Sequence, residues 1–226
     1  MAGVAVFVVA VLAVIVVAAL WGTSVVPDGP TANSGITARA DGTARQAGSA
    51  DIAPASTPIS EWRAGEMPYL YQTDTAWASE PYAGGTVAKN GCGPTCVTMA
   101  DVYLTGRADL TPADMCARAE AGGWFYDGMT TWTYMTEGVA QLGLVGEEQP
   151  ADAGVLRSLL AAGTPIICSM RPGDFTKSGH FILLAGLDGD GDVIVRDPNS
   201  EQRSHQTWDL QRVINQCANI WSMRLA

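Results

Sequence analysis

Apolar and polar positions divide the chain into three regions. Residues 2–21 form an apolar run of about the 20 residues that a helix needs to cross a bilayer core. Residues 22–62 are rich in Ala, Ser, Thr, Gly, Pro and Asp and have no apolar periodicity. We therefore expect a transmembrane anchor or signal segment over 1–21, a disordered linker over 22–62 and one folded domain over 63–226.

The first region favours an uncleaved anchor over a signal peptide. A signal peptide has a basic segment before its apolar stretch, but no Lys or Arg precedes Arg39. Cleavage near Gly22-Thr23-Ser24 is the alternative. We expect a protein held at the cell membrane by one N-terminal helix with its domain outside, or else a secreted one.

The first half of the domain has helical spacing. Thr111 and Pro112 read as an N-cap and a first-turn proline, which predicts a helix over 112–121. Apolar residues at three- and four-residue steps predict further segments: one starting at or just after Cys92 and ending at Gly106, one built on Trp132, Met135, Val139 and Leu142, and one over 152–162 with Val155, Leu156, Leu159 and Leu160 on one face.

After Gly163 the pattern changes to short β-rich runs. Residues 164–170, 180–187 and 192–197 are separated by Gly and Asp and predict strands. A short helix is expected over 206–217 and a last strand over 219–225. Helices followed by antiparallel strands are typical of an α+β domain.

The charge argues against some partners. The chain carries a net charge of -10, and from Arg63 onward 11 basic residues stand against 19 acidic ones, which leaves the domain at -8. Nucleic acid and anionic lipid are therefore not expected as partners. The domain is expected to be a monomer.

Cys92 is the candidate nucleophile. It lies at the start of a predicted helix, where the macrodipole and free N–H groups stabilise a thiolate. Gly91 and Gly93 flank it and would let a substrate backbone approach, so both are candidate substrate contacts. The remaining cysteines either form up to two disulfides or are buried thiols; they are Cys96, Cys116, Cys168 and Cys217.

A base and an orienting group are available for this thiol. His180 begins a predicted strand, whereas His205 lies in a polar stretch. A two-residue turn at Asp188-Gly189 would set His180 opposite Asp197, and a longer loop would shift the pairing by about two residues. Asp197 would then orient the imidazole, as the third member of a triad does.

No metal or cofactor is expected. Cys92, Cys96 and His180 lack a fourth ligand at zinc-finger spacing. The stretch DGDGD at 188–192 has Val193 at the sixth position of a calcium loop and Asn199 at the twelfth, where Gly and Glu are needed, so a hairpin turn is the better interpretation.

Trp124 and Trp132 are candidate aromatic contacts to a substrate. Trp124 follows two glycines and precedes Phe125 and Tyr126 in a predicted loop. Aromatic residues in such a loop form a small satellite core as often as they line a cleft, and both interpretations stay open.

Three stretches together resemble a known family. The segments YQTDTAWASEPYAGGTVAKNGCGP, GCGPT and SGHFILLAGLDGDGDVIVRDPNS are similar to the C39-like subgroup of papain-like cysteine peptidases, over roughly residues 67–225. The resemblance implies a papain-like fold in which the nucleophile helix packs on an antiparallel sheet. It also implies Cys92 as nucleophile, His180 as general base, Asp197 as orienting residue and Gln72 as the side-chain donor of an oxyanion hole completed by the Cys92 N–H.

The chain departs from the best-characterised members of that subgroup. Those members are fused to export transporters, and this chain contains no transporter, so leader-peptide processing is not carried over. Gln72 also stands 20 residues before Cys92, farther than in those domains.

Three hypotheses for function follow. The first is a cysteine hydrolase that cleaves peptide bonds in proteins or in cell-wall peptides. The second is a peptidoglycan amidase or transpeptidase. The third is a non-catalytic binding module that retains the fold, against which the intact set of Cys92, His180 and Asp197 stands.

Overall fold

The computed structural model describes residues 54–226. The predicted anchor over 1–21 lies outside these residues, and no helix within them is both long and apolar enough to cross a membrane. The last residues of the predicted linker pack on the domain. Trp62 is buried, and its Nε1 donates to the Thr57 carbonyl at 2.9 Å. Residues just before Arg63, where the sequence placed the start of the domain, are thus in contact with it.

Short helices and strands alternate along the described chain. In order they are η1 (Ile59–Glu61), β1 (Pro81–Tyr82), β2 (Gly85–Thr86), α1 (Val87–Asn90), α2 (Cys92–Thr105), α3 (Pro112–Ala121), β3 (Phe125–Tyr126), β4 (Met129–Thr130), η2 (Trp132–Met135), α4 (Glu137–Ala140), β5 (Leu144–Glu148), α5 (Ala153–Ala161), β6 (Ile166–Met170), β7 (His180–Leu187), β8 (Val193–Arg196), α6 (Glu201–Ser204), β9 (Thr207–Trp208), α7 (Leu210–Ile214) and β10 (Cys217–Leu225).

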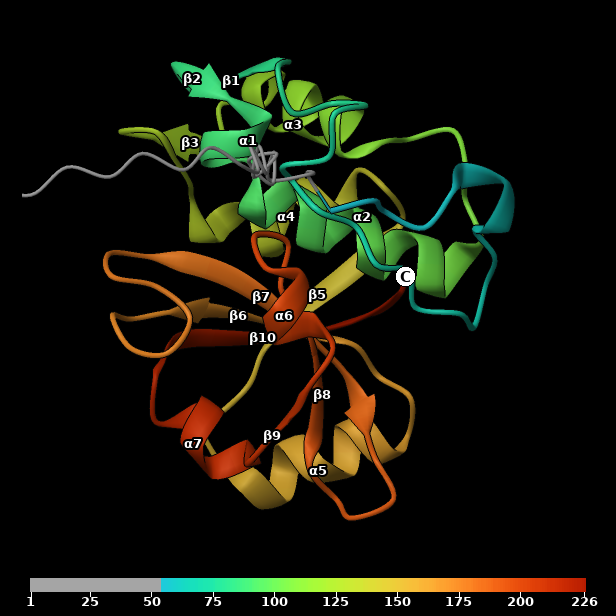
Figure 1. Cartoon of the computed structure of the whole chain (residues 1–226), viewed down its shortest axis with the longest axis vertical. Coiled ribbons are helices and arrows are strands. Elements are labelled where there is room, and N and C mark those ends of the chain that lie inside the picture. Colours follow the sequence, from blue (N-terminus) through green and yellow to red (C-terminus); the bar gives the residue numbers. More distant parts are fainter. Residues whose placement is uncertain (1–53) are drawn as a thin grey trace, which may run out of the picture. The chain divides into compact units, whose positions relative to one another are not determined.

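A six-stranded antiparallel sheet in the order β5-β10-β6-β7-β8-β9 lies between two groups of helices. Helices α1 to α4 lie above it in Figure 1, and α5 and α7 lie below. Both α2 and α5 contact the central strand β7, from opposite faces. The predicted α+β architecture, with the nucleophile helix packed on an antiparallel sheet, is therefore confirmed.

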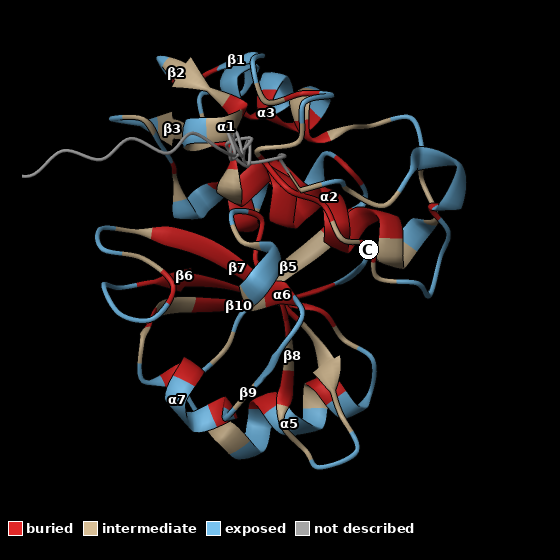
Figure 2. Cartoon of the chain, in the orientation of Figure 1, coloured by how far each residue is buried: buried red, intermediate tan, exposed pale blue. Residues whose placement is uncertain are grey.

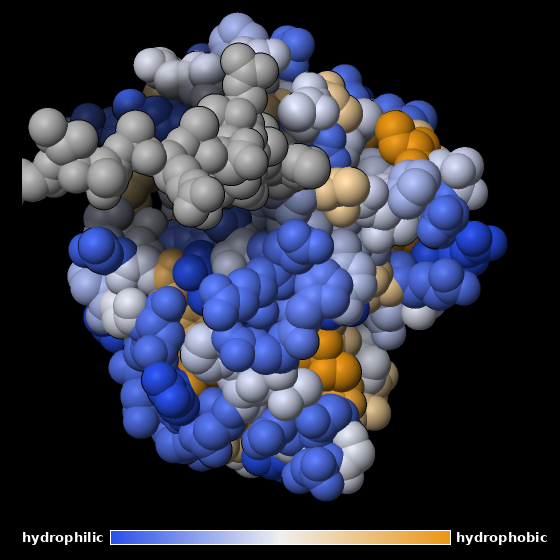
Figure 3. Space-filling view, viewed as in Figure 1, coloured by the Kyte–Doolittle hydropathy of each residue, from blue (hydrophilic) through white to orange (hydrophobic). Residues whose placement is uncertain are grey.

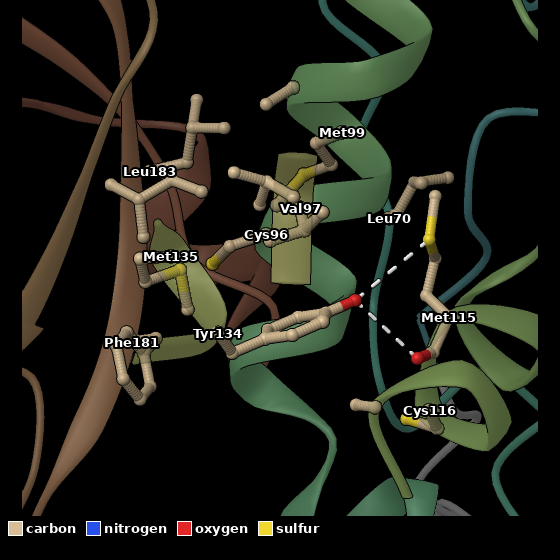
Figure 4. Close-up of a cluster of buried hydrophobic side chains, with 14 of the residues drawn as sticks. Leu70, Cys96, Val97, Met99, Met115, Cys116, Tyr134, Met135, Phe181 and Leu183 are labelled. Carbon is tan, nitrogen blue, oxygen red and sulfur yellow. Dashed lines mark hydrogen bonds between the residues drawn. The ribbon is translucent and has the colours of Figure 1, made fainter. Parts of the chain in front are cut away.

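Each face of the sheet carries its own core. On one face α2 packs on Phe181 and Leu183, with α3 packed against α2, and on the other face α5 and α7 share a core with Ile182 and Leu184, as strand alternation requires. Figure 2 shows α2 and the central strands as the most continuously buried elements. In Figure 4, Cys96 and its neighbours on α2 fill the space between the sheet and α3.

The strongest helix signals are confirmed. Helix α3 has the predicted bounds, and Thr111 and Asp114 form a capping box. Helix α2 begins at Cys92 and ends before Gly106, which has a φ of 73°. The predicted helix over 152–162 is α5, capped by the Asp152 side chain, but only part of its predicted apolar face is buried, because Val155 stays 38% exposed.

Two predicted helices are wrong in length. The segment built on Trp132 splits into the 3₁₀ turn η2 and the single turn α4, because β-branched threonines and Gly138 give it weak helix propensity. The segment over 206–217 contains strand β9 before the short α7. Strand β5 was not predicted at all, and it exists through its pairing with β10.

The five cysteines form no disulfide, and all of them lie in the described part of the chain. Four are buried, and they are Cys96, Cys116, Cys168 and Cys217. The alternative of buried thiols thus applies to these four, and Cys92 alone is partly exposed.

Candidate active site

Cys92 is the first residue of α2, immediately after Gly91. Its thiol therefore lies at the positive end of a helix of 14 residues, beside N–H groups that the helix itself does not use. Cys96, one turn later, is fully buried, and burial raises the pKa of its thiol well above the usual value. The helix thus presents one accessible thiol and one inert thiol.

His180 and Asp197 come together at the end of the sheet. His180 is the first residue of β7, and Asp197 follows the last residue of β8. His180 Nε2 lies 2.7 Å from Asp197 Oδ1, and both side chains are buried. An orienting carboxylate makes a hydrogen bond of this kind to a general base.

The geometry keeps His180 protonated near neutral pH. Burial lowers the pKa of His180, but the hydrogen bonds and charges of Asp197 and Cys92 outweigh burial and raise it to about 10. Since Nε2 is bonded to Asp197, Nδ1 is the ring nitrogen left for Cys92. A protonated imidazole next to the thiol is the arrangement that stabilises a thiolate.

The Asp197 carboxylate is ionised despite its burial. Burial raises the pKa of Asp197, but His180 and Arg203 outweigh this effect and hold it below its ordinary value. Its Oδ1 also accepts from the Asn199 N–H at 2.8 Å, and its own N–H donates to Ser204 Oγ at 2.8 Å.

The predicted hairpin register is corrected by the structure. The turn is not a two-residue one at Asp188-Gly189, because Asp188 N–H donates to the Asp192 carbonyl and its Oδ1 accepts from the N–H groups of Asp190 and Asp192. A bulge at Ala185 shifts the pairing again, so that Leu183 pairs with Arg196. The register follows the longer-loop alternative, and Asp197 reaches His180 from beyond the end of β8.

A cavity of about 550 Å³ opens beside Cys92 and His180. Two hairpin turns form part of its wall, Ala83-Gly84 between β1 and β2 and Asp127-Gly128 between β3 and β4. All four of these residues have positive φ. Ser169 and Phe181 of the sheet also line it, so the cavity lies between the helical layer and the sheet.

Asn90, two residues before the start of α2, is bonded to the first of these turns. Its side-chain amide donates to the carbonyls of Tyr82 and Ala83, each at 3.2 Å, and it also lines the cavity. A short segment before Cys92 thereby fixes one wall of the cavity.

The family comparison agrees with this geometry. A model described as the Peptidase_C39 like family matches residues 65–224. The chain belongs to this family. None of the curated protein sequences matches the chain. Among solved structures, the peptidase domain of Streptococcus ComA, a bi-functional ABC transporter involved in a quorum-sensing pathway, is similar, with 16% identity, a TM-score of 0.42, and coverage of 61% of this chain and 91% of that one.

Within this C39-like domain Gln72 lies between α1 and the Asp197 loop. Its Nε2 donates to the Ala88 carbonyl at 2.7 Å, and its backbone N–H donates to the Pro198 carbonyl at 2.7 Å. The side chain is buried, and it does not line the cavity among the described residues. An amide nitrogen has two N–H bonds, so one remains after the bond to Ala88.

The glycines that flank Cys92 are packed against protein atoms. A Cβ on Gly93 would lie 2.9 Å from Thr130 Cβ and Oγ1, and one on Gly91 would lie 2.6 Å from the Val87 carbonyl oxygen. Both glycines are required by close internal contacts, whatever they add to substrate binding.

The two candidate tryptophans lie outside the cavity lining of the C39-like domain. Trp124 packs against Tyr134 at the edge of the core. Trp132 is 48% exposed, and its Nε1 donates to Ser169 Oγ at 3.2 Å. Trp132 therefore contacts a residue that lines the cavity, although it does not line the cavity itself.

The sequence reasoning missed several residues of this site, above all Arg203, Asn90 and Met129. Arg203 Nε lies 2.5 Å from Asp197 Oδ2. The stretch DPNSEQRS carried a signal for it, because Ser200 is an N-cap residue that starts a helical turn just after an Asp-Pro strand end. Asn90 and Met129 had no local signal in the sequence. Both line the cavity because of the hairpins β1–β2 and β3–β4, and each of these hairpins has only two residues in each strand.

Within the described residues, no cluster of three or more His, Cys, Asp or Glu side chains could hold a metal ion.

Proposed function

We propose that this C39-like domain is a cysteine hydrolase that cleaves peptide bonds through Cys92, His180 and Asp197. The observation that carries the proposal is the 2.7 Å contact of His180 with a buried Asp197, in a cavity that Cys92 enters from a helix N-terminus. A histidine with a raised pKa beside a thiol fits a thiolate nucleophile better than a structural role.

The proposed reaction has two stages. The Cys92 thiolate attacks the carbonyl carbon of the peptide bond, and the His180 imidazolium gives its proton to the leaving nitrogen, which departs as an amine and leaves a thioester. His180 then takes a proton from water, whose oxygen attacks the thioester. The acid product leaves, and the thiolate and imidazolium are restored.

Gln72 and the Cys92 N–H are the proposed donors to the oxyanion of each tetrahedral intermediate. The bond from Gln72 to Ala88 holds the amide against α1, the segment that leads into Cys92. Donors fixed in advance stabilise developing charge without reorganisation.

The proposed substrates are peptides, proteins or cell-wall peptides, cleaved by a monomer that its N-terminal segment holds at the membrane, with its domain outside, or that is secreted. Water and an amine are both possible acceptors from the thioester, and the acceptor separates a peptidase from a transpeptidase.

The test is alkylation of the full chain by iodoacetamide between pH 5 and 9, with peptide mapping. An ordinary thiol with a pKa near 8.5 is only about 0.3% ionised at pH 6, so an activated Cys92 should react at least tens of times faster there. Cys92→Ala should remove the fast reaction and His180→Ala should slow it. Cys96→Ala is the matched control and should change nothing.

A slow Cys92, unaffected by His180→Ala, would sink the proposal and favour a binding module. Where the thiol is fast, digestion of a protein panel beside purified peptidoglycan distinguishes a peptidase from an amidase or transpeptidase.

A further inference from the structure

Arg203 contacts the oxygen of Asp197 that His180 does not use. His180 Nε2 and the Asn199 N–H share Oδ1, whereas Arg203 Nε lies 2.5 Å from Oδ2. The Asp197 side chain is 0% exposed and that of Arg203 is 25% exposed. The ion pair is therefore largely shielded from solvent, unlike the surface pair of Arg212 with Asp174.

Arg203 supplies a second positive charge to the proposed catalytic cluster. In the proposed mechanism the Cys92 thiolate and the Asp197 carboxylate carry two negative charges, and the His180 imidazolium carries one positive charge. Arg203 brings the cluster to neutrality. A buried carboxylate with only a histidine partner would lose part of its charge stabilisation each time His180 gives up its proton.

The local structure holds Arg203 in place. It lies in α6, a turn whose N-cap Ser200 accepts from the Arg203 N–H at 3.2 Å. The Arg203 carbonyl accepts from Trp208 Nε1, also at 3.2 Å. After this turn, His205 stacks on Tyr69 with ring centroids 4.6 Å apart. The guanidinium is thus presented to Asp197 by a turn that is fixed on both sides.

We infer that Arg203 is a positioning residue of the active site, which keeps Asp197 ionised and directed at His180 while the proton of His180 is transferred. This inference rests on the proposed function. The titratable or charged groups that face Asp197 are His180 from β7, Arg203 from α6 and Cys96 from α2. Arg203 is the one among them that is positively charged throughout the catalytic cycle.

The test compares Arg203→Met, Arg203→Lys and Arg212→Met in the full chain. The readouts are the pH profile of Cys92 alkylation, and kcat and KM on a peptide that the wild type cleaves. Removing a cation raises every pKa around it, so Arg203→Met should move the acid limb of the alkylation profile upward by about half a unit or more. It should also lower kcat between about tenfold and a hundredfold, with little change in KM.

The controls separate positioning from folding. Arg203→Lys keeps the charge. Compared with Arg203→Met, it should return the acid limb most of the way to its wild-type pH and recover part of kcat. Arg212→Met removes an arginine that pairs with Asp174 on the surface, away from Asp197, and it should keep the wild-type limb. An Arg203→Met profile that matches the wild type, or equal limb shifts in Arg203→Met and Arg212→Met, would overturn the inference.

The same experiment distinguishes the two levels of the proposal. A wild-type Cys92 that shows no fast alkylation dependent on His180 defeats the proposed function, and the role of Arg203 with it. A fast wild-type Cys92 whose pH profile ignores Arg203→Met defeats the inference alone.

Discussion

At the scale of single residues, environment rather than residue type separates the cysteines. Cys92 and Cys96 stand four positions apart on α2. Cys96 belongs to the hydrophobic core between α2 and the sheet, and Cys92 packs against that core. Cys96 is 0% exposed, and burial raises its pKa, whereas Cys92 reaches the cavity and lies against His180. We therefore expect a reactive thiol in the first turn, where the helix supplies positive potential and the core does not yet enclose the side chain.

Gly93 shows how tightly that first turn is packed, and its replacement is predicted to destabilise the domain. In Gly93→Ala the added Cβ meets Thr130 at 2.9 Å, and Thr130 cannot move freely because its Oγ1 is bonded to Tyr82 Oη at 2.8 Å. We expect a loss of about 1–3 kcal/mol in the free energy of unfolding, measured by urea denaturation.

Gly189→Ala is the matched control for this prediction. Its added Cβ has no atom within 4 Å, so a change within about 0.5 kcal/mol is expected. Equal effects of the two substitutions would contradict the packing argument.

At the scale of elements, the sequence predicted those parts that local interactions decide. Helix α3 was predicted to the residue because its capping box and first-turn proline lie within four positions. The pairing of His180 with Asp197 was predicted in outline, since the two strands are joined by one short turn. Its register was not, because the bulge at Ala185 has no local signature.

Elements that depend on distant partners escaped prediction. Strand β5 pairs with β10 more than 70 positions away in the chain. The hairpins β1–β2 and β3–β4 have only two residues a strand, too few for an alternating pattern, yet their turns line the cavity. The placement of Cys92 and His180 beside one cavity was therefore predictable from the sequence, and the walls of that cavity were not.

The β3–β4 hairpin is predicted to control access to Cys92 through Met129. Met129 lines the cavity, and its Cε would be 3.3 Å from a Cβ placed on Gly179 across the opening. Met129→Ala removes the side chain that approaches Gly179, so a bulky maleimide should react faster with Cys92. A barrier lower by about 1 kcal/mol corresponds to roughly fivefold in rate.

Small iodoacetamide should react with Met129→Ala at the wild-type rate. Tyr126→Ala is the matched control, because Tyr126 pairs with Met129 in the same hairpin but does not line the cavity. An equal gain for both reagents, or the same gain in Tyr126→Ala, would remove the hairpin from the control of access.

At the scale of the whole molecule, the candidate site joins the two halves of the fold. Cys92 comes from the helical layer, and His180 and Asp197 come from the sheet and the loop beyond it. The face shown in Figure 3 is mostly hydrophilic, with small separate apolar spots, in keeping with the domain's charge of -8. Any change in the packing of α2 on β7 therefore alters the distance between Cys92 and His180, so we expect stability and the proposed activity to be coupled.

The contacts that His180 makes in the folded protein predict a pH dependence of stability. The pKa of His180 is raised from an ordinary 6.5 to about 10 in the folded protein. A group whose pKa is raised by folding contributes stability that is complete below the unfolded value and is lost as the pH rises through the folded value. The free energy of unfolding of the wild type should therefore exceed that of His180→Gln most near pH 6, and the difference should shrink as the pH approaches 10.

Cys92→Ala tests how much of this pH-dependent stability depends on Cys92 and how much on Asp197, the two partners of His180. The thiol is one of the two groups that raise the pKa of His180, so its removal should move the loss of stability to lower pH. Urea unfolding of the three full-length proteins at intervals between pH 6 and 10.5 provides the measurement. A difference between wild type and His180→Gln that stays constant over this range would mean that His180 is neutral in the fold, and the thiolate–imidazolium pair would have to be abandoned.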